Sequence, residues 1–324
     1  MRPARSDEPG RQSCSGQTSK TSQEAARGSV GKGLASAHLA LVLFVALSLL
    51  PAASFGQDAQ TAGTAQQGSA VEETGDNPAE PADAPAADTD IALADATTAS
   101  ADTINLSDPN PGSGTNWSYD SASGTFTISA GAVTVTGNTS TRRVVVAGFA
   151  AITLSGATIN LIGTDSAVPI DIVGSANVRL TLRGDSTLRG GTEAAAMRVA
   201  DTASLTVTAA STGSLTAIGG EGIDGDPGGA GIQGGSITIQ GGTLDARGNE
   251  SDAAGISASS ITISDGRVEA QGGWNTAGIT AETIQISGGK VRATGGYCAA
   301  GIGGNIGESV GNITISGGTV EANG

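Results

Sequence analysis

A repeated unit in the C-terminal part of this chain constrains its fold more than any other feature. Four copies read SITIQGGTLDARG, SITISDGRVEAQGG, TIQISGGKVRATGG and NITISGGTVEANG. Each copy has two short alternating segments joined by a glycine-containing turn, and a shorter piece (GAGIQ, AAGIS, TAGIT or AAGIG) precedes it. The fourth residue of each copy is an isoleucine, and it recurs at spacings of 24, 23 and 29 residues, at Ile239, Ile263, Ile286 and Ile315.

A repeat of this length, made of short alternating segments, predicts a β-solenoid. A single copy cannot bury its apolar side, whereas stacked copies place each isoleucine on that of the next coil. Because neighbouring side chains of a strand point to opposite sides, we expect Ile237 and Ile239 inside and Thr238 outside. The equivalent outward side chains then form a polar ladder: Thr238, Thr262, Gln285 and Thr314.

Weaker copies extend toward the N-terminus and raise the expected number of coils to about eight. An insertion falls in the 32 residues between Val207 and Ile239. We therefore expect residues 104–324 to be mostly parallel strand, with no helix longer than two turns. The apolar anchors of the weaker copies are Ile128, Leu154, Leu182 and Val207.

Composition agrees with a thin stacked core and restricts the chemistry. Aromatic residues make up 2% of the chain and glycines number 51, which suits coils filled by small and branched aliphatic side chains. The net charge of −15 disfavours nucleic-acid binding, because an acidic surface repels phosphate. The single histidine, His38, precedes the repeats, which excludes Ser–His and Cys–His nucleophile systems from them.

The N-terminal region has the pattern of an export signal followed by a linker. Residues 39–50 read LALVLFVALSLL, follow six basic residues and precede a small-residue stretch that ends at Gly56. This pattern predicts a secretory signal peptide over residues 1–56, with an uncleaved N-terminal anchor as the alternative. Residues 57–103, rich in Ala, Asp, Thr and Pro, are expected to be a disordered acidic linker.

The sequence stops at Gly324, before the third segment of a coil, and none of its last residues resembles a polar cap. A solenoid needs a cap on its terminal coil, because an uncapped edge pairs with other chains. We therefore expect the solenoid of residues 104–324 to be truncated at the C-terminus, with edge-to-edge assembly as the alternative.

The strings ITISGGTVEANG and GGYCAAGIGG, with the opening GTNWSYDSASGTFTIS, resemble secreted bacterial parallel β-helix proteins. The resemblance covers roughly residues 104–324. It implies an all-β fold, a right-handed parallel β-helix with three short strands per coil, and export to the cell surface. Many such proteins are described as carbohydrate-binding or adhesin-like. In the opening string, Trp117 and Tyr119 are expected to cover the first coil rather than to bind a ligand.

The second alternating segment of each copy carries charges at equivalent positions. These charges predict a ladder of cross-strand ion pairs. A site for an anionic sugar, formed by Arg267, Lys290 and Arg292, is the alternative, and a lyase centre is a third reading. The two columns are Asp245, Glu269, Arg292 and Glu321, and beside them Thr243, Arg267, Lys290 and Thr319.

The insertion, GGEGIDGDPGG over residues 219–229, brings three carboxylates into one loop. Glu221, Asp224 and Asp226 are the ligand type that calcium prefers, and the loop begins like a calcium-binding GGxGxD nonapeptide. Asp226 stands where that nonapeptide requires an apolar residue, so a solvated turn is the alternative. No cofactor is expected apart from this calcium candidate.

Trp274 and Tyr297 both follow a Gly-Gly pair and lie 23 residues apart, which is one coil period. We therefore expect the two rings at the same place on adjacent coils, beside a strip of outward glycines. Together they would offer a flat platform on which a sugar stacks. The alternative is two rings that stack on each other over a turn.

These features predict a secreted or cell-surface, non-catalytic β-helix that binds an extracellular polysaccharide or a host or cell-surface glycan. A membrane is expected as a partner only through the N-terminal signal or anchor. The alternatives are a purely structural spacer and a polysaccharide lyase or hydrolase. The expected glycan-binding residues are Trp274, Tyr297, Arg267, Lys290 and Arg292.

Overall fold

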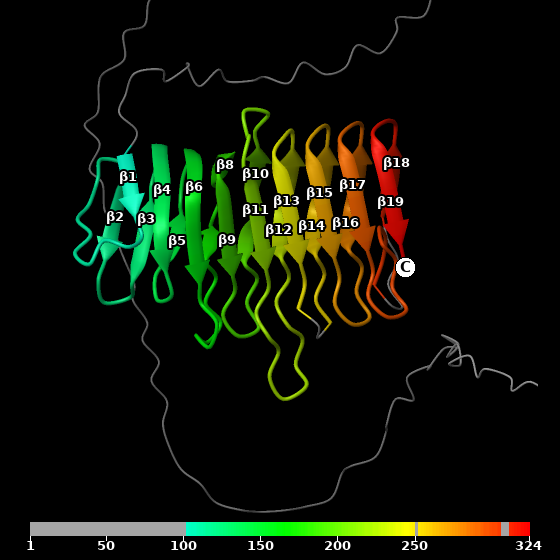
Figure 1. Cartoon of the computed structure of the whole chain (residues 1–324), viewed down its shortest axis with the longest axis horizontal. Helices are drawn as coiled ribbons and strands as arrows, with labels where there is room; N and C mark the ends of the chain where they lie inside the picture. Colours follow the sequence, from blue (N-terminus) through cyan, green and yellow to red (C-terminus); the bar gives the residue numbers. More distant parts are fainter. Residues whose placement is uncertain (1–101, 250–251, 306–310) are drawn as a thin grey trace, which may run out of the picture. The chain divides into compact units, whose positions relative to one another are not determined.

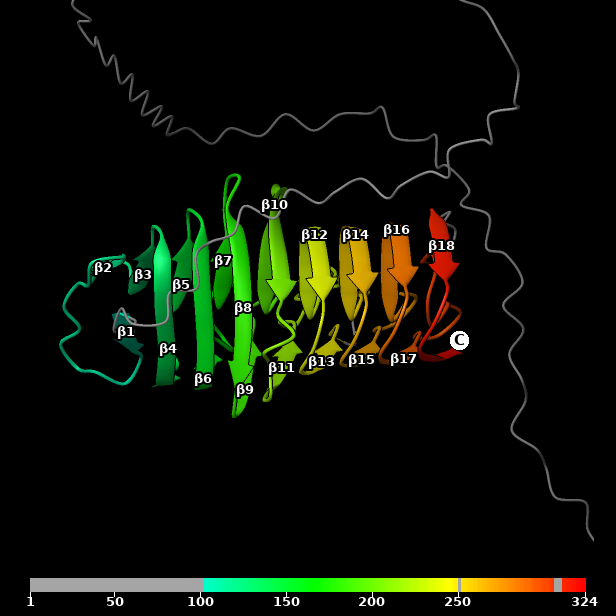
Figure 2. The same ribbon diagram turned by 90° about the horizontal axis from the view of Figure 1, so that it is seen from above.

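The computed structural model describes residues 102–249, 252–305 and 311–324. These residues form nineteen strands of one continuous sheet and contain no helix, which confirms the expected all-β class. The chain winds into coils stacked along one axis, so that strands of successive coils lie side by side (Figures 1 and 2). No described residue belongs to a helix able to cross a membrane. The predicted signal peptide and the linker up to residue 101 lie outside the described residues.

Three ladders of parallel strands run along the coils, one for each short segment of the repeat. The protein is therefore a parallel β-helix of about eight coils, as predicted. The first ladder uses the SITI-type segments. It comprises β1 (Asp102–Asn105), β4 (Gly131–Thr139), β6 (Ala150–Asn160), β8 (Asn177–Arg183), β10 (Met197–Val207), β12 (Ile232–Ile239), β14 (Ile256–Ile263), β16 (Ile279–Ile286) and β18 (Asn312–Ile315).

The second ladder uses the segments that follow the glycine turn, and the third uses the short AGI-type pieces. Strands β10, β12, β14 and β16 begin in the third ladder and end in the first. The ends of β4 and β6 begin the second ladder, which continues through β9 (Asp185–Arg189), β11 (Ser214–Ile218), β13 (Thr243–Arg247), β15 (Arg267–Gln271), β17 (Lys290–Thr294) and β19 (Thr319–Asn323). The third ladder starts with β3 (Thr125–Ile128), β5 (Arg143–Val146) and β7 (Ile170–Ile172), and β2 (Trp117–Asp120) pairs with β3 at its end.

Inward side chains of the first ladder stack in register through the core. Ile239, Ile263 and Ile286 lie opposite one another and are at most 1% exposed, which confirms the predicted stack. Ile315 continues this register but is 52% exposed, because only one described coil packs against it. Threonine or glutamine separates the inward positions and faces outward, so the predicted polar ladder is also confirmed.

Register in the weaker copies differs from the prediction. Val207 pairs with Ile239 as expected, but the residue opposite Val207 in the preceding coil is Leu180 rather than Leu182. Ile128 lies in the third ladder, opposite Val146. Alternation has a period of two, so a two-residue shift keeps every apolar side chain inside and the pattern alone does not select the register.

The first coil is covered by an antiparallel hairpin of β2 and β3, the one departure from parallel pairing among the described strands. The ring of Trp117 lies 5.7 Å from that of Phe126, and the ring of Tyr119 lies 4.5 Å from it. Phe126 itself is fully buried. The opening aromatics therefore close the end of the core, as the sequence predicted.

Turns that connect the second ladder to the third project along one edge of the solenoid, which we call the loop edge. The loop edge includes residues 190–196, 219–231, 272–278 and 295–301. The predicted insertion, residues 219–229, lies within the segment 219–231, the long lime-coloured loop at the bottom of Figure 1. The loop edge therefore borders the second ladder along several coils.

Candidate functional site

The outward side of the second ladder carries charged side chains in every coil from β13 to β19. Asp245 lies opposite Glu269, and Glu269 lies opposite Arg292, so the predicted central column is confirmed. The predicted neighbouring column is also in register, with Arg267 opposite Lys290. A further column stands at the other end of the strands: Arg189, Ile218, Arg247, Gln271 and Thr294.

Two ion pairs on this side form within single strands. Arg247 donates from Nε and Nη2 to both carboxylate oxygens of Asp245, at 2.9 and 2.6 Å. Arg267 pairs through Nη2 with Oε1 of Glu269, two residues along β15. Side chains at i and i+2 share one side of a strand, and the long guanidinium side chain spans the distance between them. The hydrogen bonds to Asp245 raise the pKa of Arg247 above its usual value.

One ion pair on this side crosses between coils. Arg292 Nε lies 3.5 Å from Glu321 Oε1. A hydrogen bond from Asn323, together with the positive charge of Arg292, lowers the pKa of Glu321 below its usual value. Among the described residues, the predicted cross-strand ladder of ion pairs is therefore reduced to Arg292 and Glu321.

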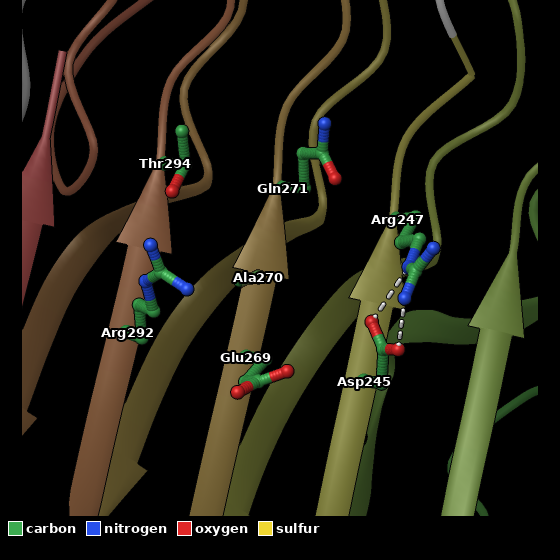
Figure 3. Close-up of a pocket in the computed structure, with 7 residues that line it drawn as sticks. All are labelled: Asp245, Arg247, Glu269, Ala270, Gln271, Arg292 and Thr294. Carbon is green, nitrogen blue, oxygen red and sulfur yellow. Dashed lines mark hydrogen bonds and ion pairs between the residues drawn. The ribbon is translucent and has the colours of Figure 1, made fainter.

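Two neighbouring hollows lie on this side, and we call them together the charged groove. The smaller has a volume of about 220 Å³, and the larger has a volume of about 640 Å³. Figure 3 shows the smaller hollow, with Glu269 and Arg292 on adjacent strands and the bonded pair of Asp245 and Arg247 beside them. The smaller hollow is lined by Asp245, Arg247, Glu269, Ala270, Gln271, Arg292 and Thr294, and the larger by Arg189, Ile218, Glu221, Gly222, Arg247, Gly248, Asn249 and Gln271.

The charged groove runs along the solenoid axis. Arg247 and Gln271 line both hollows, so the two hollows adjoin along the ladder. From Arg189 to Thr294 it crosses four coil steps. At about 4.8 Å for each step, its length is roughly 19 Å. A groove of this length, lined by carboxylates, guanidinium groups and amides, can hold several hydroxyl-bearing units of a polymer in a row.

The five residues predicted to bind a glycan lie in three places: the charged groove, the first positions of β15 and β17, and the loop edge. Arg292 lines the charged groove, whereas Arg267 and Lys290 stand at the first positions of their strands. Those positions lie about 13 Å from the strand ends that Gln271 and Thr294 occupy. The five predicted residues therefore do not converge on one hollow.

Trp274 and Tyr297 lie on the loop edge, three residues beyond Gln271 and Thr294. Their ring centroids are 4.7 Å apart with an interplanar angle of 15°, so the rings stack face to face. Trp274 is 55% exposed and Tyr297 is 42% exposed. The predicted proximity is confirmed, but each ring covers one face of the other. The pair therefore does not offer two coplanar faces to a sugar, and one outer face of each ring remains for a ligand.

The calcium candidate is not assembled as a cluster. Within the described residues, no three acidic, histidine or cysteine side chains are close enough together to hold a metal ion. Glu221 instead lines the larger hollow, while Asp224 stands in the left-handed backbone region with φ of 53°. Calcium binding by Glu221, Asp224 and Asp226 stays a prediction.

Sequence reasoning missed the further column of outward side chains, from Arg189 to Thr294, at the ends of the strands. Arg189, Arg247 and Gln271 end their strands at equivalent positions, and that shared position was the available signal. The missing information was the register of the weaker copies, which places Arg189 two coils before Arg247. The contribution of Glu221 was also missed, because the path of the insertion is not visible in the repeat pattern.

Comparison with known proteins agrees with the geometry. A family model described as a beta helix repeat matches residues 237–260, 261–279, 284–307 and 313–324. These matches fall on the coils whose strands have the clearest repeat. No curated protein and no solved structure matched the chain. The comparison therefore supports a parallel β-helix repeat protein and names no ligand.

Proposed function

We propose that this β-helix repeat protein is a non-catalytic extracellular or cell-surface protein that binds a glycan along the charged groove, in the manner of an adhesin. The observation that carries this proposal is the groove itself. Its hydrogen-bonding side chains recur at the coil period on one side of a rigid solenoid. A linear glycan has recurring hydroxyl groups, so a repeated set of partners along a straight groove matches it.

The chemistry of the lining suits hydroxyl groups. Asp245 and Glu269 accept hydrogen bonds, Arg247 and Arg292 donate them, and Gln271 does both. The ion pairs hold the charged side chains in place before a ligand arrives, which lowers the entropy cost of binding. The outer faces of Trp274 and Tyr297, just beyond the strand ends, add apolar surface against which a sugar ring could pack.

The location and the absence of catalysis are parts of the same proposal. Export rests on the signal-like pattern over residues 39–50, and the partner would be an extracellular polysaccharide or a host or cell-surface glycan. The repeats contain no histidine, and the groove carboxylates of Asp245 and Glu269 are engaged with arginines. These features favour a binding surface over a lyase or hydrolase.

The test is a binding screen of neutral and acidic polysaccharides against the parent protein and two double variants. Gln271→Ala/Thr294→Ala removes two groove side chains that take part in no ion pair of the described structure. Trp274→Ala/Tyr297→Ala removes the aromatic pair. We expect the first variant to lose most of the affinity and the second to lose a smaller part.

The matched control is Thr238→Ala/Thr262→Ala, which removes outward side chains from the first ladder. All variants should melt like the parent before binding is compared. If the parent binds no glycan, or if the groove variant binds as well as the parent, the proposal is wrong and a structural spacer is favoured. Release of unsaturated products, seen as a rise in ultraviolet absorbance, would instead establish a lyase.

A further inference from the structure

The insertion contributes one wall of the larger hollow of the charged groove. This hollow lies where β9, β11 and β13 end and where residues 219–231 leave the solenoid. Glu221 and Gly222, at the start of the insertion, form one wall. The turns at 272–278 and 295–301 are shorter, so the wall is a feature of this one coil.

Hydrogen bonds fix the base of the insertion to the coils on both sides. Gly229 N donates to Gly220 O at 2.8 Å, which closes the base. Glu193 N, in the preceding coil, donates to Glu221 O at 2.8 Å, and Asn249 N, in the following coil, donates to Gly229 O at 3.1 Å. The wall that Glu221 provides is therefore held in a defined position.

Arg189 is the available cation of this hollow. It is half-buried, and within the described residues its guanidinium makes no ion pair. Arg247, two coils away, already donates from Nε and Nη2 to the carboxylate of Asp245. Ile218 stands between the two arginines in the same column and presents apolar surface. The hollow thus has one unengaged guanidinium, an apolar patch and polar side chains around them.

From this arrangement we infer that the hollow takes one carboxylate-bearing sugar of the bound glycan, with the carboxylate on Arg189. The inference rests on the proposed function and adds the class of ligand. A guanidinium presents two parallel N–H donors that match the two oxygens of a carboxylate. The ring of the sugar would pack on Ile218, and its hydroxyls would reach Arg247 in the next coil.

Glu221 should affect the affinity for a carboxylate in the opposite direction to Arg189. Its carboxylate lines the same hollow and repels a bound carboxylate, so it should weaken the binding that Arg189 strengthens. Substitutions at the two positions are therefore expected to change affinity in opposite directions. A hollow that only fills with water would show neither change.

The experiment measures binding of the full chain to alginate, to its propylene glycol ester and to polysialic acid. The ester keeps the alginate backbone and lacks the charge, and polysialic acid distinguishes a sialic acid from a hexuronic acid. We expect the parent to prefer an acidic polymer over the neutral ester. Arg189→Gln should reduce that preference roughly 10-fold, and Glu221→Gln should increase it several-fold.

Arg179→Gln is the matched control, because it removes the same charge from an exposed position on β8 in the first ladder. It should leave the preference unchanged. If the parent binds glycans and Gln271→Ala/Thr294→Ala weakens that binding, but Arg189→Gln behaves like Arg179→Gln, this inference is overturned and the proposed function stands. A parent that prefers the neutral ester would likewise overturn this inference and leave the proposed function standing. If the parent binds no glycan, both are overturned.

Discussion

The first and second ladders share one coil period and one kind of register, yet their outward sides differ in chemistry. On the first ladder, Ser260 Oγ donates to Ser236 Oγ at 3.0 Å, and Thr238 and Thr262 lie in the next outward column. The outward side of the second ladder has ion pairs and the charged groove. Stacking needs apolar residues inside and leaves the outward positions free. In the coils from β12 to β18, the outward side chains of the first ladder are neutral, so the second ladder is the better candidate for binding there.

The inward sides of these ladders also differ. The first ladder places isoleucine at successive inward positions, as at Ile261 and Ile263. The second alternates a larger residue with alanine, as at Val268 and Ala270, which are both buried. The larger side chains of the first ladder fill more of the core, so substitutions there should cost more stability.

The largest effect is expected from Ile286→Asp in the first ladder. Ile286 is 1% exposed, so the substitution places an unpaired carboxylate in a dry apolar stack. The free energy of unfolding should fall by several kcal/mol, measured by chemical denaturation. Gln285→Asp, one residue earlier and facing outward, is the control and should stay close to the parent. Equal stability of the two variants would show that the inward assignment of the first ladder is wrong.

A direct comparison of the two ladders comes from Ile263→Ala and Val268→Ala, both fully buried positions. Truncation of a buried isoleucine to alanine typically costs roughly 2–5 kcal/mol of unfolding free energy. The valine truncation should cost about 1 kcal/mol less, because valine has one methylene group fewer. Denaturant titration of both variants checks the order. A larger loss at Val268 would reverse the proposed contrast between the ladders.

Ion pairs provide a third comparison, between a pair on the third ladder and one on the second. Arg198 holds Asp171 through two hydrogen bonds of 2.9 and 2.6 Å, and the Asp171 side chain is 5% exposed. Arg198→Gln leaves a buried carboxylate without its charged partner and should cost roughly 1–3 kcal/mol. Arg247→Gln removes a half-exposed partner of Asp245 and should cost about 0–1 kcal/mol.

Thermal unfolding at neutral pH measures both losses. A smaller loss of stability for Arg247→Gln than for Arg198→Gln would show that the Arg247–Asp245 pair mainly positions side chains of the charged groove. It would contribute little to the stability of the fold. An Arg247→Gln variant that melts well below Arg198→Gln would instead give the groove arginine a mainly structural role.

The smallest effect is expected on the loop edge. Trp274→Ala/Tyr297→Ala removes an exposed ring stack, which contributes about 0.5–1.5 kcal/mol beyond simple burial. The melting temperature should fall slightly, and the near-ultraviolet circular dichroism of the pair should disappear. Trp274→Phe, which keeps an aromatic ring, should retain most of the stability. A collapse of the fold in the double variant would contradict an exposed pair that is available to a ligand.

Much of the fold was predictable because it depends on local patterns. Alternation in segments such as SITI determines which side chains face inward, and the recurrence of Ile239 and Ile263 determines the coil length. The proximity of Trp274 and Tyr297 followed from the same period. How those rings meet did not follow, because a spacing of one coil is compatible with edge-to-edge or face-to-face rings.

By itself the sequence determined a parallel β-helix, its period, its buried isoleucines and two of the three outward columns of the second ladder. The tertiary structure decided the register of the weaker coils, since a two-residue shift preserves alternation and only the packing of whole coils distinguishes the choices. It also decided that Arg189, Glu221 and Arg247 line one hollow. That hollow depends on hydrogen bonds that fix the insertion between two coils, and no periodic pattern encodes the path of a single irregular loop.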